Sequence, residues 1–215
     1  MKRGLSQARW QTFARDCRQN EIIVVNDASS DRTAECVTEF ARTEPCVTLV
    51  SNPGPPGFGY AIRYGIAKSN GEAVAIMMAD LSDSAGDLIA YYRKLQEGYD
   101  CVFGSRFIKG SHVIDYPAHK LLLNRAANFF IRVLFALSFN DITNAFKIYR
   151  REVVDAMQPL ISAHFNLTVE MPLKAIIRGY TFAVIPISWT NRKAGASKLK
   201  MYKRDKDSKY NAHHA

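Results

Sequence analysis

The chain has 215 residues, 47% of them hydrophobic, which suits one globular domain with a sizeable core and excludes a disordered protein. Its 29 Lys and Arg outnumber its 20 Asp and Glu, and the net charge of +9 favours anionic partners such as phosphates, nucleic acid or acidic lipid headgroups. Four cysteines without a C-x-x-C pair predict reduced, mostly buried thiols in a cytosolic protein: Cys17, Cys36, Cys46 and Cys101.

No segment of the sequence predicts secretion or a membrane span. The N-terminal segment is charged throughout and lacks the apolar stretch of a signal peptide. The most apolar segment, residues 129–139, is interrupted by Arg132 and is shorter than the ~20 residues that a spanning helix needs. We therefore expect no transmembrane helix.

Short apolar segments alternate with helical patterns, which is typical of βαβ units and of the α/β class. The expected strands are residues 21–25, 47–50, 73–78, 101–104 and 182–187, and the first four are apolar enough to be buried on both faces. The expected helices are residues 31–42, 58–69, 86–97, 118–138, 151–157 and 167–178. Residues 1–198 then form a single domain, and residues 199–215 form a basic polar tail.

The first candidate site is VVNDASSDRT, residues 24–33, where a strand leads into small polar residues and then a helix. Ligands of open α/β sheets bind at the carboxyl ends of strands, where Asp27 can accept hydrogen bonds from a nucleoside base or ribose. Ser29 lies where the helix N-terminus begins. The alternative is a plain strand-to-helix turn in which Ser29 and Asp31 cap the helix.

The second candidate site is IMMADLSDS, residues 76–84, where a buried strand ends in carboxylates. Asp80 and Asp83 offer hard oxygen ligands for Mg²⁺ or Mn²⁺, ions that are commonly held by one or two carboxylates together with substrate phosphates. The alternative for Asp83 is a helix cap, shared with Ser82 and Ser84.

Six ordered segments resemble the family 2 glycosyltransferases and, within them, the polyprenyl-phosphate sugar transferases of the dolichol-phosphate mannosyltransferase type. They are VVNDASSDRT (24–33), N-x4-GFGYAIRYGI (52–66), MMADLSDS (77–84), GSRFIKG (104–110), DITNAFKIYRREVV (141–154) and NRKAGASKLK (191–200). The resemblance implies a GT-A fold, in which helices flank a mostly parallel, Rossmann-like sheet. It also implies inverting transfer of a sugar from GDP-mannose or a UDP-sugar to a polyprenyl or dolichyl phosphate.

The resemblance also implies roles for single residues. Asp80 matches the later carboxylate of the family's metal motif, and Asp83 is its expected neighbour at the ion. Arg106 matches a residue that holds the acceptor phosphate, which suits the fork-shaped guanidinium. The expected nucleotide-sugar site comprises Asp27, Ser29, Gly57, Gly59, Arg192 and Lys198.

Catalysis would then consist mostly of positioning and electrostatic stabilisation, because an ionised acceptor phosphate is itself the nucleophile. The helix at residues 118–138 would serve the lipid, since it is apolar over most of its circumference with Lys120, Arg125 and Arg132 interspersed. Such a helix can lie in the headgroup region of a membrane, as a peripheral anchor or beside a membrane-protein partner. A buried helix or a dimer face would have the same composition.

The chain departs from the family pattern in two places. Family members open with a central strand that precedes the first helix, whereas this sequence opens on the helix. The strands at 21–25 and 73–78, which flank that strand in the family, are therefore expected not to pair with each other. Met78 stands where many members have the earlier metal aspartate.

Three other functions fit parts of the sequence. One is glycosyl transfer to a saccharide, and another is an inactive truncated remnant that binds nucleotide-sugar or lipid. The third is nucleic-acid binding, which we do not expect because the recognition motifs of that class are missing.

Overall fold

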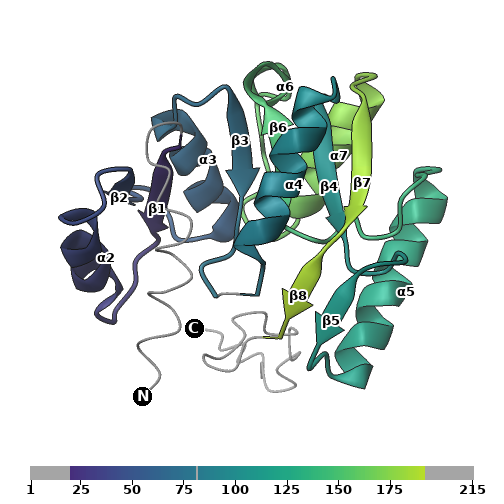
Figure 1. Cartoon of the computed structure of the whole chain (residues 1–215), viewed down its shortest axis with the longest axis horizontal. Coiled ribbons are helices and arrows are strands. Elements are labelled where there is room, and N and C mark those ends of the chain that lie inside the picture. Colours follow the sequence, from purple (N-terminus) through teal and green to yellow (C-terminus); the bar gives the residue numbers. More distant parts are fainter. Residues whose placement is uncertain (1–19, 81, 192–215) are drawn as a thin grey trace, which may run out of the picture.

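The computed structural model describes residues 20–80 and 82–191, which form an α/β fold (Figure 1). The strands are β1 (Ile22–Asn26), β2 (Val47–Ser51), β3 (Ala73–Ile76), β4 (Cys101–Ser105), β5 (His112–Ile114), β6 (Lys147–Arg150), β7 (Phe182–Pro186) and β8 (Ser188–Thr190). The helices are α2 (Thr33–Ala41), α3 (Phe58–Lys68), α4 (Ala85–Gln96), α5 (Ala118–Leu134), α6 (Arg151–Ala156) and α7 (Leu167–Ile177). All the expected helices and the five expected strands are present, with shifted ends.

The largest sheet has the strand order β3-β6-β4-β7. It is mixed, because β6 runs antiparallel to both of its neighbours whereas β4 and β7 are parallel. Two parallel pairs, β1 with β2 and β5 with β8, form separate small sheets. The α/β class is confirmed, and the sequence missed the short strands β5, β6 and β8.

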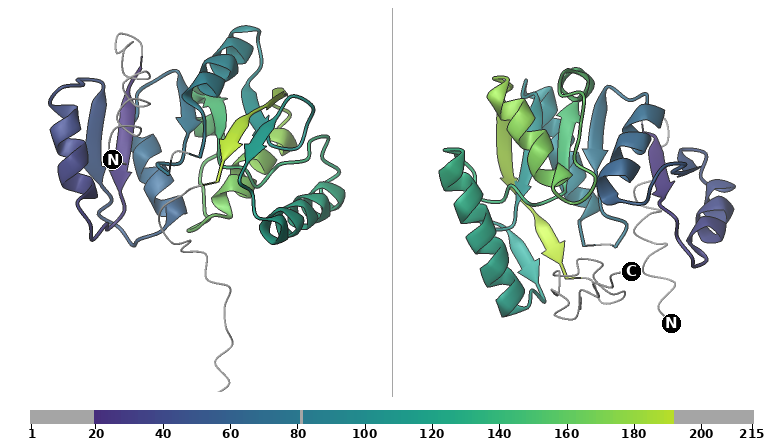
Figure 2. Two further views of the ribbon diagram at one scale, coloured as in Figure 1. Left: turned by 60° about the horizontal axis from the view of Figure 1, so that its bottom comes forward. Right: turned by 180° about the vertical axis from the view of Figure 1, so that it is seen from behind.

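Strands β1 and β3 do not pair with each other. Within residues 20–80 and 82–191, β1 pairs with β2 and β3 pairs with β6, which confirms the expectation for the segments at 21–25 and 73–78. Figure 2 shows β1, β2 and α2 standing beside the larger sheet. Only β4 is buried at every position, so the prediction that the first four strands are buried on both faces is wrong for β1, β2 and β3. Strands in a two-stranded sheet or at a sheet edge have fewer neighbours to cover them.

The core lies around β4. The Phe103 ring lies 5.1 Å from that of Phe139 and 5.2 Å from that of Phe182, centroid to centroid. On the other face, Tyr91 of α4 stacks on Phe146 at 4.5 Å and donates its hydroxyl hydrogen bond to the Phe146 carbonyl. Core side chains thus pack against both faces of β4, with Phe103 in one cluster and Val102 in the other, and this packing fixes the direction in which its carboxyl end points.

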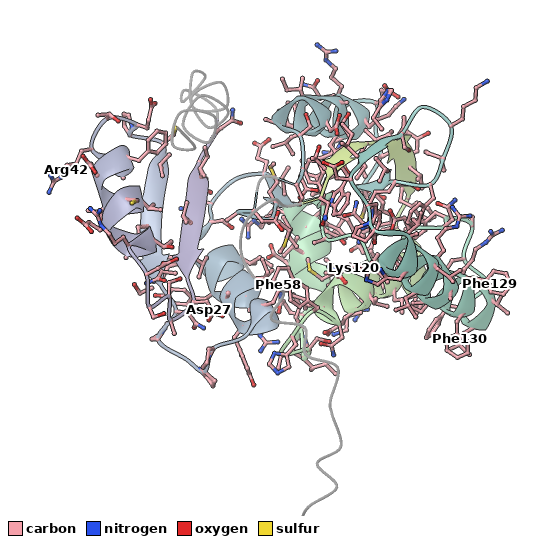
Figure 3. The ribbon with its side chains drawn as sticks, turned by 90° about the horizontal axis from the view of Figure 1, so that it is seen from below. Asp27, Arg42, Phe58, Lys120, Phe129 and Phe130 are labelled. Atoms are coloured by element: carbon pink, nitrogen blue, oxygen red, sulfur yellow. The ribbon has the colours of Figure 1, made fainter. Side chains whose placement is uncertain are left out.

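Helix α5 exposes most of its apolar side chains, contrary to the buried-helix alternative. Asn128 is its one buried residue, while Leu122 is 71% exposed, Phe129 67% and Phe130 66%. In Figure 3 the side chains of Phe129 and Phe130 project away from the body of the protein. Among the described helices none is long and apolar enough to cross a membrane.

The cysteines differ from the expectation of mostly buried thiols. Cys101 is free and buried, as expected, but Cys36 is free and exposed. Cys46 is disulfide-bonded, so the prediction of reduced thiols is wrong for this residue. Cys101 lies in the hydrophobic core, whereas helix α2, which carries Cys36, has no buried residue.

Candidate active site

The carboxyl ends of β1, β3 and β4 point toward the same side of the molecule (Figure 1), and the predicted site residues follow them. Asp27 comes directly after β1. Its two carboxylate oxygens accept hydrogen bonds from Asn52 Nδ2 at 2.9 Å and from the Gly57 backbone N–H at 2.8 Å. Asp27 therefore joins the end of β1 to the loop after β2 and to the start of α3. Ser29 is exposed and donates its backbone N–H to Asn26 Oδ1 at 3.1 Å.

The two glycines of the GFG motif pack against the loop between α6 and α7. A Cβ at Gly59 would lie 2.0 Å from the Ser162 carbonyl oxygen, and one at Gly57 would lie 2.6 Å from that of Ala163. The Gly59 N–H donates to the Ala163 carbonyl at 2.9 Å. These positions admit no side chain, because the backbones of two segments meet there.

That loop is fixed from two sides by charged residues. Arg63 of α3 donates to the carbonyls of Leu160 at 3.0 Å and Ser162 at 2.8 Å. The Glu170 carboxylate accepts the N–H groups of Ile161 at 2.8 Å and Ser162 at 2.7 Å. Burial opposes ionisation of Glu170, but hydrogen bonds from the Lys174 side chain, from the Ser162 side chain and from these backbone groups outweigh it and lower its pKa to about 2.

We expect Gly59→Ala to destabilise the protein by about 1–3 kcal/mol, the usual cost of forcing an atom into a packed contact. Gly86→Ala is the matched control, because a Cβ there meets nothing closer than Ser84 Oγ at 3.6 Å and α4 should gain up to about 1 kcal/mol. Urea unfolding of both variants measures the difference. Equal free energies of unfolding for the two variants would contradict the close approach at Gly59.

The carboxylates of the second motif lie in the turn between β3 and α4. Asp80 Oδ1 accepts the Ser82 N–H at 3.1 Å, and Asp83 Oδ2 accepts the Met78 N–H at 3.3 Å. Asp83 is buried, and no side chain caps α4, which excludes the capping alternative for Asp83. Burial raises the pKa of Asp83 to about 7, the Asp80 charge adds to the rise, and the Met78 hydrogen bond and the Arg106 charge oppose it. The two carboxylates are therefore close enough to repel each other.

The raised pKa of Asp83 predicts how stability changes with pH. Its pKa is about 7 in the folded state and near 3.8 in the unfolded state, so between these values the folded protein binds more protons. The contribution of Asp83 to stability should therefore fall as pH rises from about 4 to about 7. Asp83→Asn, which keeps an acceptor for Met78, should flatten that slope in thermal melts recorded with a chelator present. If the melting temperatures of wild type and variant changed equally with pH across this range, the burial of an ionisable Asp83 would be refuted.

Arg106 follows β4 directly and forms a buried ion pair with Asp141. Its Nη2 lies 2.6 Å from Asp141 Oδ1, and its Nε lies 2.8 Å from Oδ2. The rings of Tyr116 and Trp189 surround the guanidinium, with centroids 5.8 and 5.6 Å from its central carbon. The Arg106 pKa is raised, since the bond and charge of Asp141 outweigh the opposing effect of burial. The Arg106 guanidinium thus stays charged and is held in place within electrostatic reach of Asp83.

Strand β8 closes the carboxylate turn. The Thr190 N–H donates to the Ser82 carbonyl at 3.0 Å, and Asp83 forms an isolated antiparallel bridge with Trp189. The chain that leaves β8 continues into the motif carrying Arg192 and Lys198, and both of these predicted residues lie outside the described residues.

The structure thus divides the predicted residues into two groups. Asp27, Gly57 and Gly59 are linked through the start of α3, with Ser29 nearby in the chain. Asp80, Asp83 and Arg106 form the second group, in the segments that follow β3 and β4. The sequence did not single out Asp141, although the DITN motif that contains it was recognised. Asn124 and Asn128, which contact this network, were missed as well, although polar residues four apart in an apolar helix could have indicated them.

Residues 5–157 match the family model described as glycosyl transferase family 2. The chain belongs to this family. It is 30% identical to the polyprenol monophosphomannose synthase of Mycolicibacterium smegmatis, over 85% of this chain and 71% of that protein. It is 25% identical to the undecaprenyl-phosphate mannosyltransferase of Micrococcus luteus, over 84% of this chain and 76% of that protein.

Solved structures support the same fold for this glycosyltransferase. The glucosyl-3-phosphoglycerate synthase of Mycobacterium tuberculosis, in complex with Mn²⁺ and UDP-glucose, superposes with a TM-score of 0.61 at 14% identity. The match covers 81% of this chain and 61% of that one, so the chain spans about three fifths of the solved protein. The GT-A fold expected from the sequence is confirmed by these neighbours.

Proposed function

We propose that this glycosyltransferase transfers a sugar from a nucleotide-sugar, GDP-mannose or a UDP-sugar, to a polyprenyl phosphate at a membrane surface. The observation that carries the proposal is the position of the carboxylate turn. Arg106 lies within electrostatic reach of Asp83 in this turn, and it donates a hydrogen bond to Asn124 of α5, the helix that exposes its apolar face. The names of the two relatives support mannose as the sugar and a polyprenyl phosphate as the acceptor.

Asp80 and Asp83 fit a divalent ion, Mg²⁺ or Mn²⁺. Both are hard oxygen donors, and their mutual repulsion, which contributes to the raised pKa of Asp83, is what a bound cation would relieve. Such an ion would supply positive charge beside the diphosphate of the donor. Asp27 and Ser29 are the proposed contacts to the nucleoside, and Arg192 and Lys198 the proposed contacts to the donor phosphates. Gly57 and Gly59 serve the donor site indirectly, because they let α3 approach the loop after α6.

Arg106 is the proposed contact to the acceptor phosphate. The Asp141 pair uses Nε and Nη2 of the guanidinium, so the Nη1 edge is the one that a phosphate would meet. Asp141 holds the guanidinium in place before substrate arrives, which reduces the entropy lost when the phosphate binds.

Helix α5 is the proposed contact to the membrane. Its outer face combines seven exposed apolar or basic positions that suit the headgroup region: Lys120, Leu122, Leu123, Arg125, Phe129, Phe130 and Arg132. Figure 3 shows Lys120 and the two phenylalanines on this helix. Apolar side chains enter the boundary of the acyl chains while basic ones meet lipid phosphates, which makes the association peripheral. A membrane-protein partner is the alternative occupant of this face.

The test is transfer of labelled sugar from GDP-mannose and from UDP-glucose to a polyprenyl phosphate held in anionic vesicles, with Mn²⁺, with Mg²⁺ and with a chelator. We expect lipid-linked product from one donor and none with the chelator. Product formed only on added saccharides would reassign the acceptor. Donor binding without turnover on any acceptor would indicate a protein that binds nucleotide-sugar and is inactive.

A further inference from the structure

Helix α5 carries a polar seam where a surface helix ordinarily carries its apolar one. Four of its residues are not exposed, at the spacing of one helical face: Leu121, Asn124, Asn128 and Ile131. Half of this inward face is therefore asparagine, while the opposite face is aliphatic and aromatic. If hydrophobic burial alone decided, the aliphatic and aromatic face of α5 would point inward. The polar contacts therefore determine which face is buried.

Asn128 uses both ends of its side chain in this seam. Its Nδ2 donates to Thr143 Oγ1 at 2.8 Å and to Asn124 Oδ1 at 2.9 Å, and its Oδ1 accepts the Thr143 N–H at 3.1 Å. The residue is 2% exposed. Removing this amide would leave the Thr143 N–H without its side-chain acceptor in a part-buried position, which costs more than the bond itself is worth.

The seam leads to the Arg106–Asp141 pair by two routes. Arg106 Nη2 donates to Asn124 Oδ1 at 3.3 Å, and Thr143 lies two residues after Asp141. The contact from Arg106 to Asp141, at 2.6 Å, is much shorter than its contact to Asn124. Arg106 thus depends on Asp141 for its own position, whereas α5 depends on Asn128 and Asn124 for its orientation relative to Arg106.

We propose that Asn128 is a positioning residue that sets the membrane-facing side of α5 in register with Arg106, so that a lipid phosphate in the bilayer meets the site at the right depth. This inference rests on the proposed function. Asn128 contacts neither substrate. It affects how well an acceptor held in a membrane reaches the site, and it does not affect the chemical step of transfer.

Hydrogen exchange tests the structural half of the proposal without any activity. In Asn128→Ala, amides of α5 should exchange about tenfold faster without vesicles, the loss expected for one or two hydrogen bonds, while those of β4 keep their protection. Asn70→Ala, at an exposed asparagine, is the control and should change neither. Unchanged exchange in α5, or faster exchange in β4 as well, would overturn the proposal.

Kinetics test the functional half. Asn128→Ala should lower transfer to a long-chain polyprenyl phosphate in vesicles by about tenfold, while transfer to a short, water-soluble polyprenyl phosphate and the KM for GDP-mannose stay within about threefold of wild type. Equal losses with both acceptors would show a merely structural role and overturn the proposal. A wild-type protein that transfers to neither acceptor would refute the proposed function instead, and the exchange experiment would still decide whether Asn128 orients α5.

Discussion

Asp80→Asn is expected to reduce sugar transfer by at least about a hundredfold, because it removes one of the two carboxylates proposed to hold a divalent ion at the donor diphosphate. The substitution keeps an oxygen that can accept the Ser82 N–H, so the turn after β3 should persist. Initial rates with GDP-mannose and a polyprenyl phosphate, at several Mn²⁺ concentrations, give the measurement.

Asp155→Asn is the matched control, since Asp155 is exposed on α6. It should leave the rate unchanged, and thermal melts should be alike for wild type and both variants. Activity of Asp80→Asn within a few-fold of wild type would eliminate the metal role. A rate that recovers at high Mn²⁺ would instead support it, because the remaining carboxylate then binds the ion more weakly.

The second large effect is expected at the outer face of α5. Replacing Phe129 and Phe130 together with serine should weaken binding to anionic vesicles by more than about a hundredfold, since burying two such rings contributes about 3 kcal/mol or more. The free energy of unfolding should change little, because the two side chains are 67% and 66% exposed. Sedimentation with vesicles measures the binding.

Ile177→Ser is the control for this experiment, because Ile177 is also apolar and is 73% exposed, but lies on α7. It should leave vesicle binding intact. Equal losses for Ile177→Ser and the double variant would mean that α5 is not the contact surface. Loss of binding in the α5 variant alone, together with normal transfer to a soluble acceptor, would separate membrane contact from catalysis.

The motifs were informative because each combines residue types with a narrow physical use. Asp27 follows one strand, and Asp80 and Asp83 follow another. Ligands of α/β sheets bind at the carboxyl ends of the strands, so the sequence places these carboxylates at the binding edge without knowledge of the strand order. Glycines such as Gly59 indicate a close approach of backbone, but the sequence could not say to what. The structure places the loop after α6 against Gly59, in contact with its backbone.

The missed elements have a common cause. Strands β5 and β8 have three residues each and β6 has four, and none of them lies within a longer apolar segment such as the one that indicated β3. Strand β6 also begins with Lys147, and a charged residue is rarely fully buried unless it has partners. In the fold its Nζ donates to the carbonyls of Ile142, at 2.9 Å, and of Thr168, at 3.2 Å, and burial lowers its pKa to about 7. Only the tertiary structure supplies those carbonyls.

The sequence by itself determined the α/β class, the helices and the residues at the ends of β1, β3 and β4, because apolar period and turn chemistry are local properties of the chain. The tertiary structure alone decided that Arg106 is paired with Asp141 and that α5 turns its asparagines inward. Helix α5 is apolar over most of its circumference, so its periodicity could not select the inner face. That choice was made by the hydrogen bonds of Asn124 and Asn128 to Thr143, whose place beside the helix is set by long-range packing.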